Sequence, residues 1–215
     1  MSTPLLLLAS TSSSRRKILD DTGFAYTTAA PNVDERAVVE AERAHAAREG
    51  LQELTPRDEA ALLANAKAHD VAARPEAAGR LVLGCDSVFE LDGVAYGKPA
   101  DAADAAARWR GMRGKTGVLH SGHTLVDTRS QPFVAVASTV STRVTFAEVS
   151  DEEIDAYVAT GEPLPCAGAF TVDGLAASFV TGIEGDFHAV VGLSVAAVRS
   201  LAADVRVPVT HLWRQ

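Results

Sequence analysis

The chain has 215 residues, of which 28 are acidic and 20 are Lys or Arg, so its formal charge is −8. This length can bury a hydrophobic core in one domain or two small lobes, and the negative charge disfavours nucleic acid as a partner because it repels polyanions. The longest apolar run near the N-terminus, residues 5–9, is too short for a membrane span or a signal peptide. Two cysteines, Cys85 and Cys166, lack the spacing of a zinc site or a disulfide framework and indicate free thiols in a cytosolic protein.

The N-terminal part predicts a strand, a helix and a second strand. The apolar run 5–9 is typical of a buried strand, and residues 14–22 followed by Gly23 predict a helix that ends at that glycine. Residues 24–28 predict a second strand, and 31–38 a polar connection that contains Asp34 and Glu35. Thr55 followed by Pro56 predicts the start of a long helix that ends near residue 73.

The remainder alternates strands and helices. Residues 81–85 have the pattern of a buried strand, Asp92-Gly93 predicts a hairpin turn, and the return strand ends at 97–99. Further helices are predicted at 101–112, at 151–160 behind a capping box that begins at Ser150, and at 194–203, with strands near 118–127 and 133–146. No repeat or low-complexity linker interrupts the chain, so we predict a single α/β or α+β domain over 1–215.

Arg15 and Lys17 fall in the first turn of the first predicted helix. Cations at a helix N-terminus are unfavourable unless an anion binds there, so the hydroxyl-rich turn before them predicts a phosphate site. The alternative is a solvated helix start that Ser12 or Ser13 caps.

Three further charged residues stand out against apolar surroundings. Lys67 lies on the apolar stripe of its helix, so its side chain either extends to solvent or points into a pocket. Asp86 ends a run that should be buried, where a carboxylate needs a cation, a metal or several donors; the alternative is a turn cap. Lys98, between Gly97 and Pro99, faces the same cleft or is an ordinary loop lysine.

Other chemistries find less support. His120 and His123 lie on opposite faces of a strand and do not form a metal pair, and no G-x-S-x-G pattern supports a covalent hydrolase. The remaining cations are Arg15, Lys67 and Lys98, and the remaining acids are Asp34, Glu35 and Asp86. Cations for phosphates, with carboxylates for a divalent metal and a water, indicate metal-assisted hydrolysis of a phosphate ester or anhydride.

Several motifs in order carry a resemblance to a known family: LASTSSSRRKIL (8–19), DE (34–35), NAKAHDVA (65–72), GCDSVFELDGVAYGKP (84–99), EEIDAYVATGEPL (152–164), AGAFTVDGLAASFV (167–180) and IEGDFHAVVGLS (183–194). The chain resembles the Maf family of nucleoside triphosphate pyrophosphatases. The resemblance implies a two-lobed α/β fold, similar to that of inosine triphosphate pyrophosphatases, with an elongated mixed β-sheet flanked by helices and an active-site cleft between the lobes. It also implies hydrolysis of a nucleoside triphosphate to the monophosphate and pyrophosphate, with Mg²⁺ or Mn²⁺, by a cytoplasmic homodimer.

The same resemblance assigns roles to residues. It places Asp86 on the catalytic aspartate that activates water, and Glu35 and Asp86 near the metal. Lys67, Lys98 and Ser10 match residues that contact the triphosphate. The first motif of the family usually reads Ala-Ser-x-Ser-Pro-Arg-Arg, and a gapless match puts Arg15 on its second arginine, with Arg16 as the alternative if the motif is shifted.

Positions linked to base specificity in the family are occupied here by Ser14, Ser87 and Asp173. These residues match neither the members that resemble dTTP and UTP pyrophosphatases nor those that act on 7-methyl-GTP, so the base stays open. Two other functions also remain: a non-catalytic nucleotide-binding regulator of cell division and septum formation, and a purine-selective enzyme of the inosine triphosphatase type.

Overall fold

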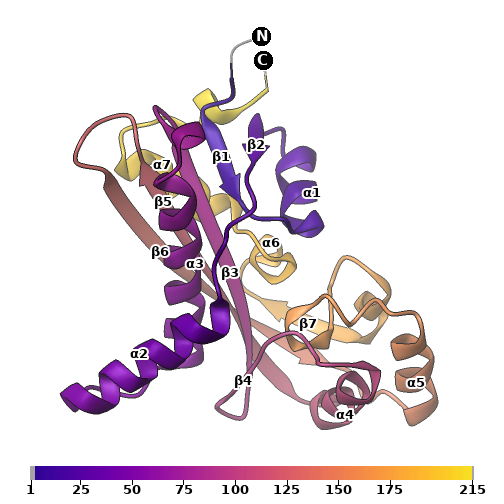
Figure 1. The fold of residues 1–215 in the computed structure, drawn as a ribbon. Coiled ribbons are helices and arrows are strands. Elements are labelled where there is room, and N and C mark those ends of the chain that lie inside the picture. The colour runs from indigo at the N-terminus through magenta and orange to yellow at the C-terminus, as the bar shows by residue number, and fades with distance from the viewer. Residues whose placement is uncertain (1–2, 215) are drawn as a thin grey trace.

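The computed structural model describes residues 3–214, which form an α/β structure around one mixed seven-stranded sheet (Figure 1). The strands are β1 (Leu6–Ala9), β2 (Tyr26–Thr28), β3 (Leu81–Leu91), β4 (Val94–Tyr96), β5 (Thr116–Asp127), β6 (Val134–Phe146) and β7 (Val180–Glu184). The α-helices are α1 (Ser13–Asp21), α2 (Glu35–Glu49), α3 (Pro56–Ala72), α4 (Ala102–Met112), α5 (Asp151–Ala159), α6 (Phe187–Val191) and α7 (Val195–Asp204). Short 3₁₀ turns are η1 (Pro75–Ala77), η2 (Ala167–Ala169), η3 (Leu175–Phe179) and η4 (Val209–Leu212).

The strands run in the order β2-β1-β3-β5-β6-β7, and β4 pairs with β3. β1 is parallel to β2 and β3, whereas the later pairings are antiparallel. β1 and β4 both lie on the edge of β3 that β5 leaves free. β1 ends with Ala9 opposite Gly84, and Tyr96, the last residue of β4, lies opposite Phe89. Within the described strands, residues 85–88 of β3 therefore have no neighbour on this edge.

Buried side chains form separate clusters in two lobes. In the upper lobe of Figure 1, α1 and α7 cover one face of the sheet and α3 covers the other. In the lower lobe, α4 and α5 pack on an aromatic cluster that includes Phe89, Trp109 and Phe146. The long strands β3, β5 and β6 run through both lobes.

α3 lies very close to the sheet because glycines stand beneath it. An added Cβ on Gly84 would meet the backbone of Ala64 and Ala68, and one on Gly122 would meet the backbone of Ala60. The helix starts after the predicted cap Thr55, and the structure adds a capping box in which Thr55 and Asp58 exchange hydrogen bonds. These contacts fix the helix that carries Lys67 against the middle of β3.

Most elements agree with the sequence-based predictions, including the hairpin at Asp92-Gly93. The polar connection predicted over 31–38 is wrong in part, because it ends at Asp34, whose side chain caps the fifteen-residue helix α2 that starts at Glu35. α2 projects from the body of the molecule (Figure 1) and buries only Val39 and Ala46. With so little apolar surface to bury, its sequence lacks the stripe that reveals most helices.

Both cysteines are free thiols, as predicted. Over residues 3–214, the helices are all too short or too polar to cross a bilayer.

Candidate active site

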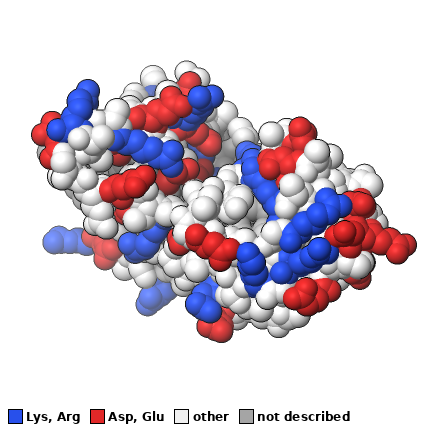
Figure 2. Space-filling view, turned by 90° about the horizontal axis from the view of Figure 1, so that it is seen from below, with Lys and Arg blue, Asp and Glu red and all other residues white. Residues whose placement is uncertain are grey.

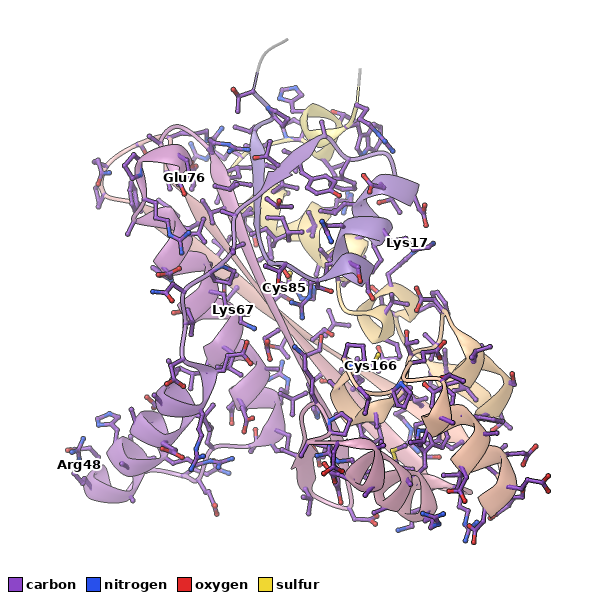
Figure 3. The ribbon with its side chains drawn as sticks, turned by 45° about the vertical axis from the view of Figure 1, so that its right-hand side comes forward. Lys17, Arg48, Lys67, Glu76, Cys85 and Cys166 are labelled. Atoms are coloured by element: carbon purple, nitrogen blue, oxygen red, sulfur yellow. The ribbon has the colours of Figure 1, made fainter. Side chains whose placement is uncertain are left out.

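A cavity of about 910 Å³ opens beside the unpaired edge of β3, between the two lobes. Its walls come from the turn after β1, the start of α2, the middle of α3, the loop at Lys98, the η2 segment and the end of α6. In Figure 3, Lys67 on α3 and Cys166 lie on opposite sides of this space. The gap between β1 and β4 thus leaves room for a ligand at the centre of the sheet, where the ends of strands and helices supply polar groups.

The floor of the cavity carries an ammonium group between two carboxylates. Lys67 Nζ donates to Asp86 Oδ1 and lies 2.7 Å from Glu35 Oε1. Lys67 and Asp86 are buried, with 7% and 8% of their surface exposed, whereas the Glu35 side chain is half exposed. The Lys67 side chain therefore points into a pocket and does not extend to solvent. Its ammonium group is the cation that the buried carboxylate of Asp86 requires.

The surroundings shift the pKa values of Asp86 and Glu35 in opposite directions. Burial raises the pKa of Asp86, although the nearby charges of Lys67 and Arg15 limit the rise. Burial also acts to raise the pKa of Glu35, but the hydrogen bond and charge of Lys67 outweigh it and leave that pKa below its usual value. Asp86 is therefore the stronger proton acceptor of the two.

The guanidinium of Arg15 is held at three points on the other side of the β3 edge. Nε donates to the Gly192 carbonyl at 2.9 Å, and the two terminal nitrogens lie 3.3 Å from Ser10 Oγ and 3.4 Å from Ser87 Oγ. The turn after β1 presents Arg15 here because Ser12 caps α1 through the Arg15 amide. A cation fixed in this way at a helix N-terminus is suited to binding a phosphate.

The other predicted residues divide into those that line the cavity and those that do not. Ser10, Ser14, Ser87 and Lys98 line it together with the residues above. Arg16 is exposed on the outer side of α1, where its carbonyl accepts from the Tyr26 hydroxyl at 3.2 Å. Asp173 is exposed and accepts a hydrogen bond from Thr171, which does line the cavity.

Sequence reasoning missed the groups that support Arg15 from behind. Ser121 on β5 lies 2.9 Å from Ser87 Oγ and donates to the Ala189 carbonyl at 2.7 Å. The Gly192 carbonyl is a backbone group, so no side chain in the sequence marks it. The only sequence signal was the IEGDFHAVVGLS segment as a whole, to which no role had been assigned.

Two histidines that were excluded as a metal pair are engaged separately. His120 lies 2.9 Å from Glu90 Oε2 and 2.8 Å from Ser141 Oγ. His123 Nε2 accepts from the Ser194 amide at 2.9 Å, at the start of α7. The expectation that they point apart is confirmed.

Figure 2 shows that acidic and basic side chains alternate over the face seen from below, without a large patch of either sign. The lining of the cavity is likewise mixed, since Arg43 on α2 and Glu59 on α3 form an ion pair of 3.0 Å at its far end. The cations around Asp86 thus form a local site for a small anion and not a surface for a polyanion.

Few side chains near Asp86 could serve as ligands of a divalent metal. Among residues 3–214, no group of three or more His, Cys, Asp or Glu side chains is arranged to hold an ion. In the described part of the chain, Glu35 and Asp86 are the two carboxylates that meet at Lys67 Nζ in the cavity. This set fits a Mg²⁺-like ion, which commonly keeps several waters and binds through one or two carboxylates plus substrate phosphates.

Comparison with known proteins gives consistent matches along the chain. A nucleoside triphosphate pyrophosphatase of Streptomyces coelicolor is 49% identical over 208 residues, which is 97% of this chain and 94% of that protein. Proteins of the same description from Salinispora tropica and Synechococcus elongatus are 50% and 42% identical, over 97% and 100% of this chain and 87% and 100% of their own lengths. The family model described as Maf-like protein matches residues 5–205, and the chain therefore belongs to the Maf family.

Proposed function

We propose that this protein hydrolyses a nucleoside triphosphate to the monophosphate and pyrophosphate. The observation that carries the proposal is one cavity that is lined by Arg15, Lys67 and Lys98 and by the buried carboxyl group of Asp86, to which Lys67 donates. The description of its relatives as nucleoside triphosphate pyrophosphatases agrees with this arrangement. The cavity of about 910 Å³ is also within the usual size of a small-molecule site.

In this mechanism the cations bind the triphosphate and Asp86 moves a proton. Arg15, Lys67 and Lys98 neutralise phosphate oxygens and orient the chain of phosphates. Asp86 accepts a proton from a water that attacks the α-phosphorus, and the bond from that phosphorus to the oxygen shared with the β-phosphorus breaks. Pyrophosphate leaves with the electron pair, and the fixed cations stabilise its developing charge.

A divalent metal is part of the proposal. Glu35 and Asp86 would hold Mg²⁺ or Mn²⁺ together with the phosphates. Such an ion supplies Lewis-acid polarisation of the phosphoryl oxygens. The protein's own contribution is to place two carboxylates and three cations on the walls of one cavity, so that phosphate and metal would be bound in the same space.

The first test is pyrophosphate release with Mg²⁺ from a panel of normal and modified triphosphates. Asp86→Asn should lower kcat by about 10²-fold or more, because the general base is removed, while the folded structure remains. Asp92→Asn, at the exposed hairpin turn, is the matched control and should leave the rate unchanged.

The outcomes of this assay also separate the alternatives. Triphosphate binding without pyrophosphate release would identify a non-catalytic regulator. A clear preference for inosine triphosphate would favour the purine-selective type. Full activity in Asp86→Asn would contradict the role of this carboxylate.

We also propose that the enzyme works as a cytoplasmic homodimer, which the resemblance to its family supports. Light scattering of the purified protein measures the oligomeric state directly.

Three residues are proposed as contributors to base selection: Ser14, Ser87 and Asp173. Ser14 and Ser87 line the cavity, and Asp173 accepts a hydrogen bond from Thr171, which also lines it.

A further inference from the structure

Lys67 occupies a position that is unusual for a phosphate-binding lysine. Its ammonium touches the two carboxylates, Glu35 and Asp86, that would bind a divalent metal. Glu35 Oε1 and Asp86 Oδ1 both lie within hydrogen-bonding distance of this one nitrogen. The ammonium and a metal would thus use the same oxygens.

The fold holds Lys67 in this place. Its side chain is 9% exposed, and α3 is pressed onto the sheet at Gly84 and Gly122. Removing the ammonium would leave the buried Asp86 without its nearest cation, which is costly in a site of low polarity. Lys67 is therefore a buried counter-ion that the fold fixes beside the carboxylates, and not a mobile surface side chain.

We propose that Lys67 competes with divalent cations for Glu35 and Asp86, so that the metal enters the site as its complex with the nucleoside triphosphate. Phosphate oxygens offer Lys67 a new anionic partner, and its departure from the carboxylates frees them for the ion. The substrate is then the metal–nucleotide complex, and a resident metal on the protein alone is disfavoured. This inference rests on the proposed function for the identity of the substrate.

Charge and ligand number both support this order. A divalent ion beside an ammonium group is repelled, and within a partly buried site that repulsion is weakly screened. Within residues 3–214, no third His, Cys, Asp or Glu side chain joins Glu35 and Asp86 in a metal-binding group, so water and phosphate oxygens would complete the coordination. A triphosphate reduces the repulsion and increases the number of ligands together, since it attracts Lys67 away from the carboxylates and adds oxygen ligands for the ion.

The test measures Mn²⁺ binding to the protein without nucleotide, by electron paramagnetic resonance or calorimetry. Lys67→Met should bind Mn²⁺ about tenfold or more tightly than the wild type, because a repelling charge is removed from between the ligands. Lys98→Met removes the same charge from the same cavity but not from between the carboxylates, and should change the affinity by no more than about twofold. Equal or weaker Mn²⁺ binding by Lys67→Met would overturn the inference.

Further variants keep the test decisive. If Lys67→Met does not fold, Lys67→Gln removes the charge and retains a donor for the carboxylates. Adding Asp86→Asn to either variant should abolish the gain in affinity, and wild-type protein should bind Mn²⁺ tightly only with an α,β-methylene triphosphate present.

The result is independent of turnover. A gain in Mn²⁺ affinity without any hydrolysis would support the competition and contradict the proposed function. If the wild type hydrolyses the triphosphate but already binds Mn²⁺ as tightly as Lys67→Met does, the proposed function is supported and the competition is contradicted.

Discussion

At the scale of single residues, two adjacent arginines have different surroundings. Arg15 spans three acceptors on three separate segments, and Arg16 lies on the exposed side of the same helix. Successive side chains on a helix point about 100° apart, so only one of the pair can face the cavity. The sequence motif left the choice between them open, and the position of Arg15 makes it the proposed phosphate ligand.

Arg15→Lys should raise KM for the triphosphate by about tenfold, with a smaller effect on kcat. A lysine keeps the charge but cannot bind the Gly192 carbonyl and both serines at once, so the cation loses its fixed orientation. Steady-state kinetics measures the effect, and Arg16→Lys is the control, expected to stay within about twofold. Equal effects of the two substitutions would show that Arg15 has no special role.

At the scale of elements, the contact between α3 and β3 determines whether Lys67 reaches Asp86. At Gly84 of β3 the helix backbone approaches so closely that an added Cβ would lie 2.6 Å from the Ala68 amide nitrogen. Because this neighbour is backbone, it cannot rotate away.

Gly84→Ala should therefore lower the free energy of unfolding by about 1–3 kcal/mol and reduce activity, since the helix must move away from the strand. Urea unfolding and pyrophosphate release check both effects. Gly111→Ala is the control: it lies in α4 with no atom within 4 Å of an added Cβ, and helix propensity predicts a gain of about 0.5–1 kcal/mol. A stable, active Gly84→Ala would mean that the helix position is not critical.

Sequence patterns predicted elements where apolar periodicity or capping was strong, and failed where neither was evident. α3 and α5 have complete capping boxes, and their starts were found to within a residue. α2 consists largely of alanines and charged residues, so nothing in its pattern distinguished it from the connection before it. β3 continues to Leu91, well past the predicted end at residue 85, because Asp86 and Ser87 interrupt the apolar run without interrupting the strand.

At the scale of the whole molecule, the buried side chain of His123 should make the folded protein less stable at low pH. The side chain is 1% exposed, and its Nδ1 has no hydrogen-bond partner among residues 3–214. Burial, and secondarily the charge of Arg15, lowers the pKa of His123 to about 4. The unfolded chain, with a usual histidine pKa of about 6.5, binds the proton more readily.

Stability should therefore fall as pH decreases from about 6.5 to about 4, by about 1–3 kcal/mol from this residue. His123→Gln retains an acceptor for the Ser194 amide but does not titrate, so its loss of stability over the same window should be smaller by that amount. Urea unfolding of both proteins at several pH values measures the difference. Parallel losses would assign the acid sensitivity to other groups.

The sequence could identify charged residues in apolar surroundings, and so it found Lys67 and Asp86 before their contact was known. It could not identify contacts through backbone atoms, such as that of Arg15 with Gly192, or the sharing of one ammonium by two acids on different elements. Those depend on tertiary structure, which brings residues 35, 67 and 86 to one point.

The continuity of β3, β5 and β6 through both lobes has a mechanical consequence. A protein whose halves meet at a flexible connection can clamp down on its ligand by rotating one half. Here the two halves share three hydrogen-bonded strands, so such a rotation would bend the sheet itself. Adjustment to different nucleotides is then left to side chains and to the projecting helix α2, whose first residue, Glu35, is already in contact with Lys67.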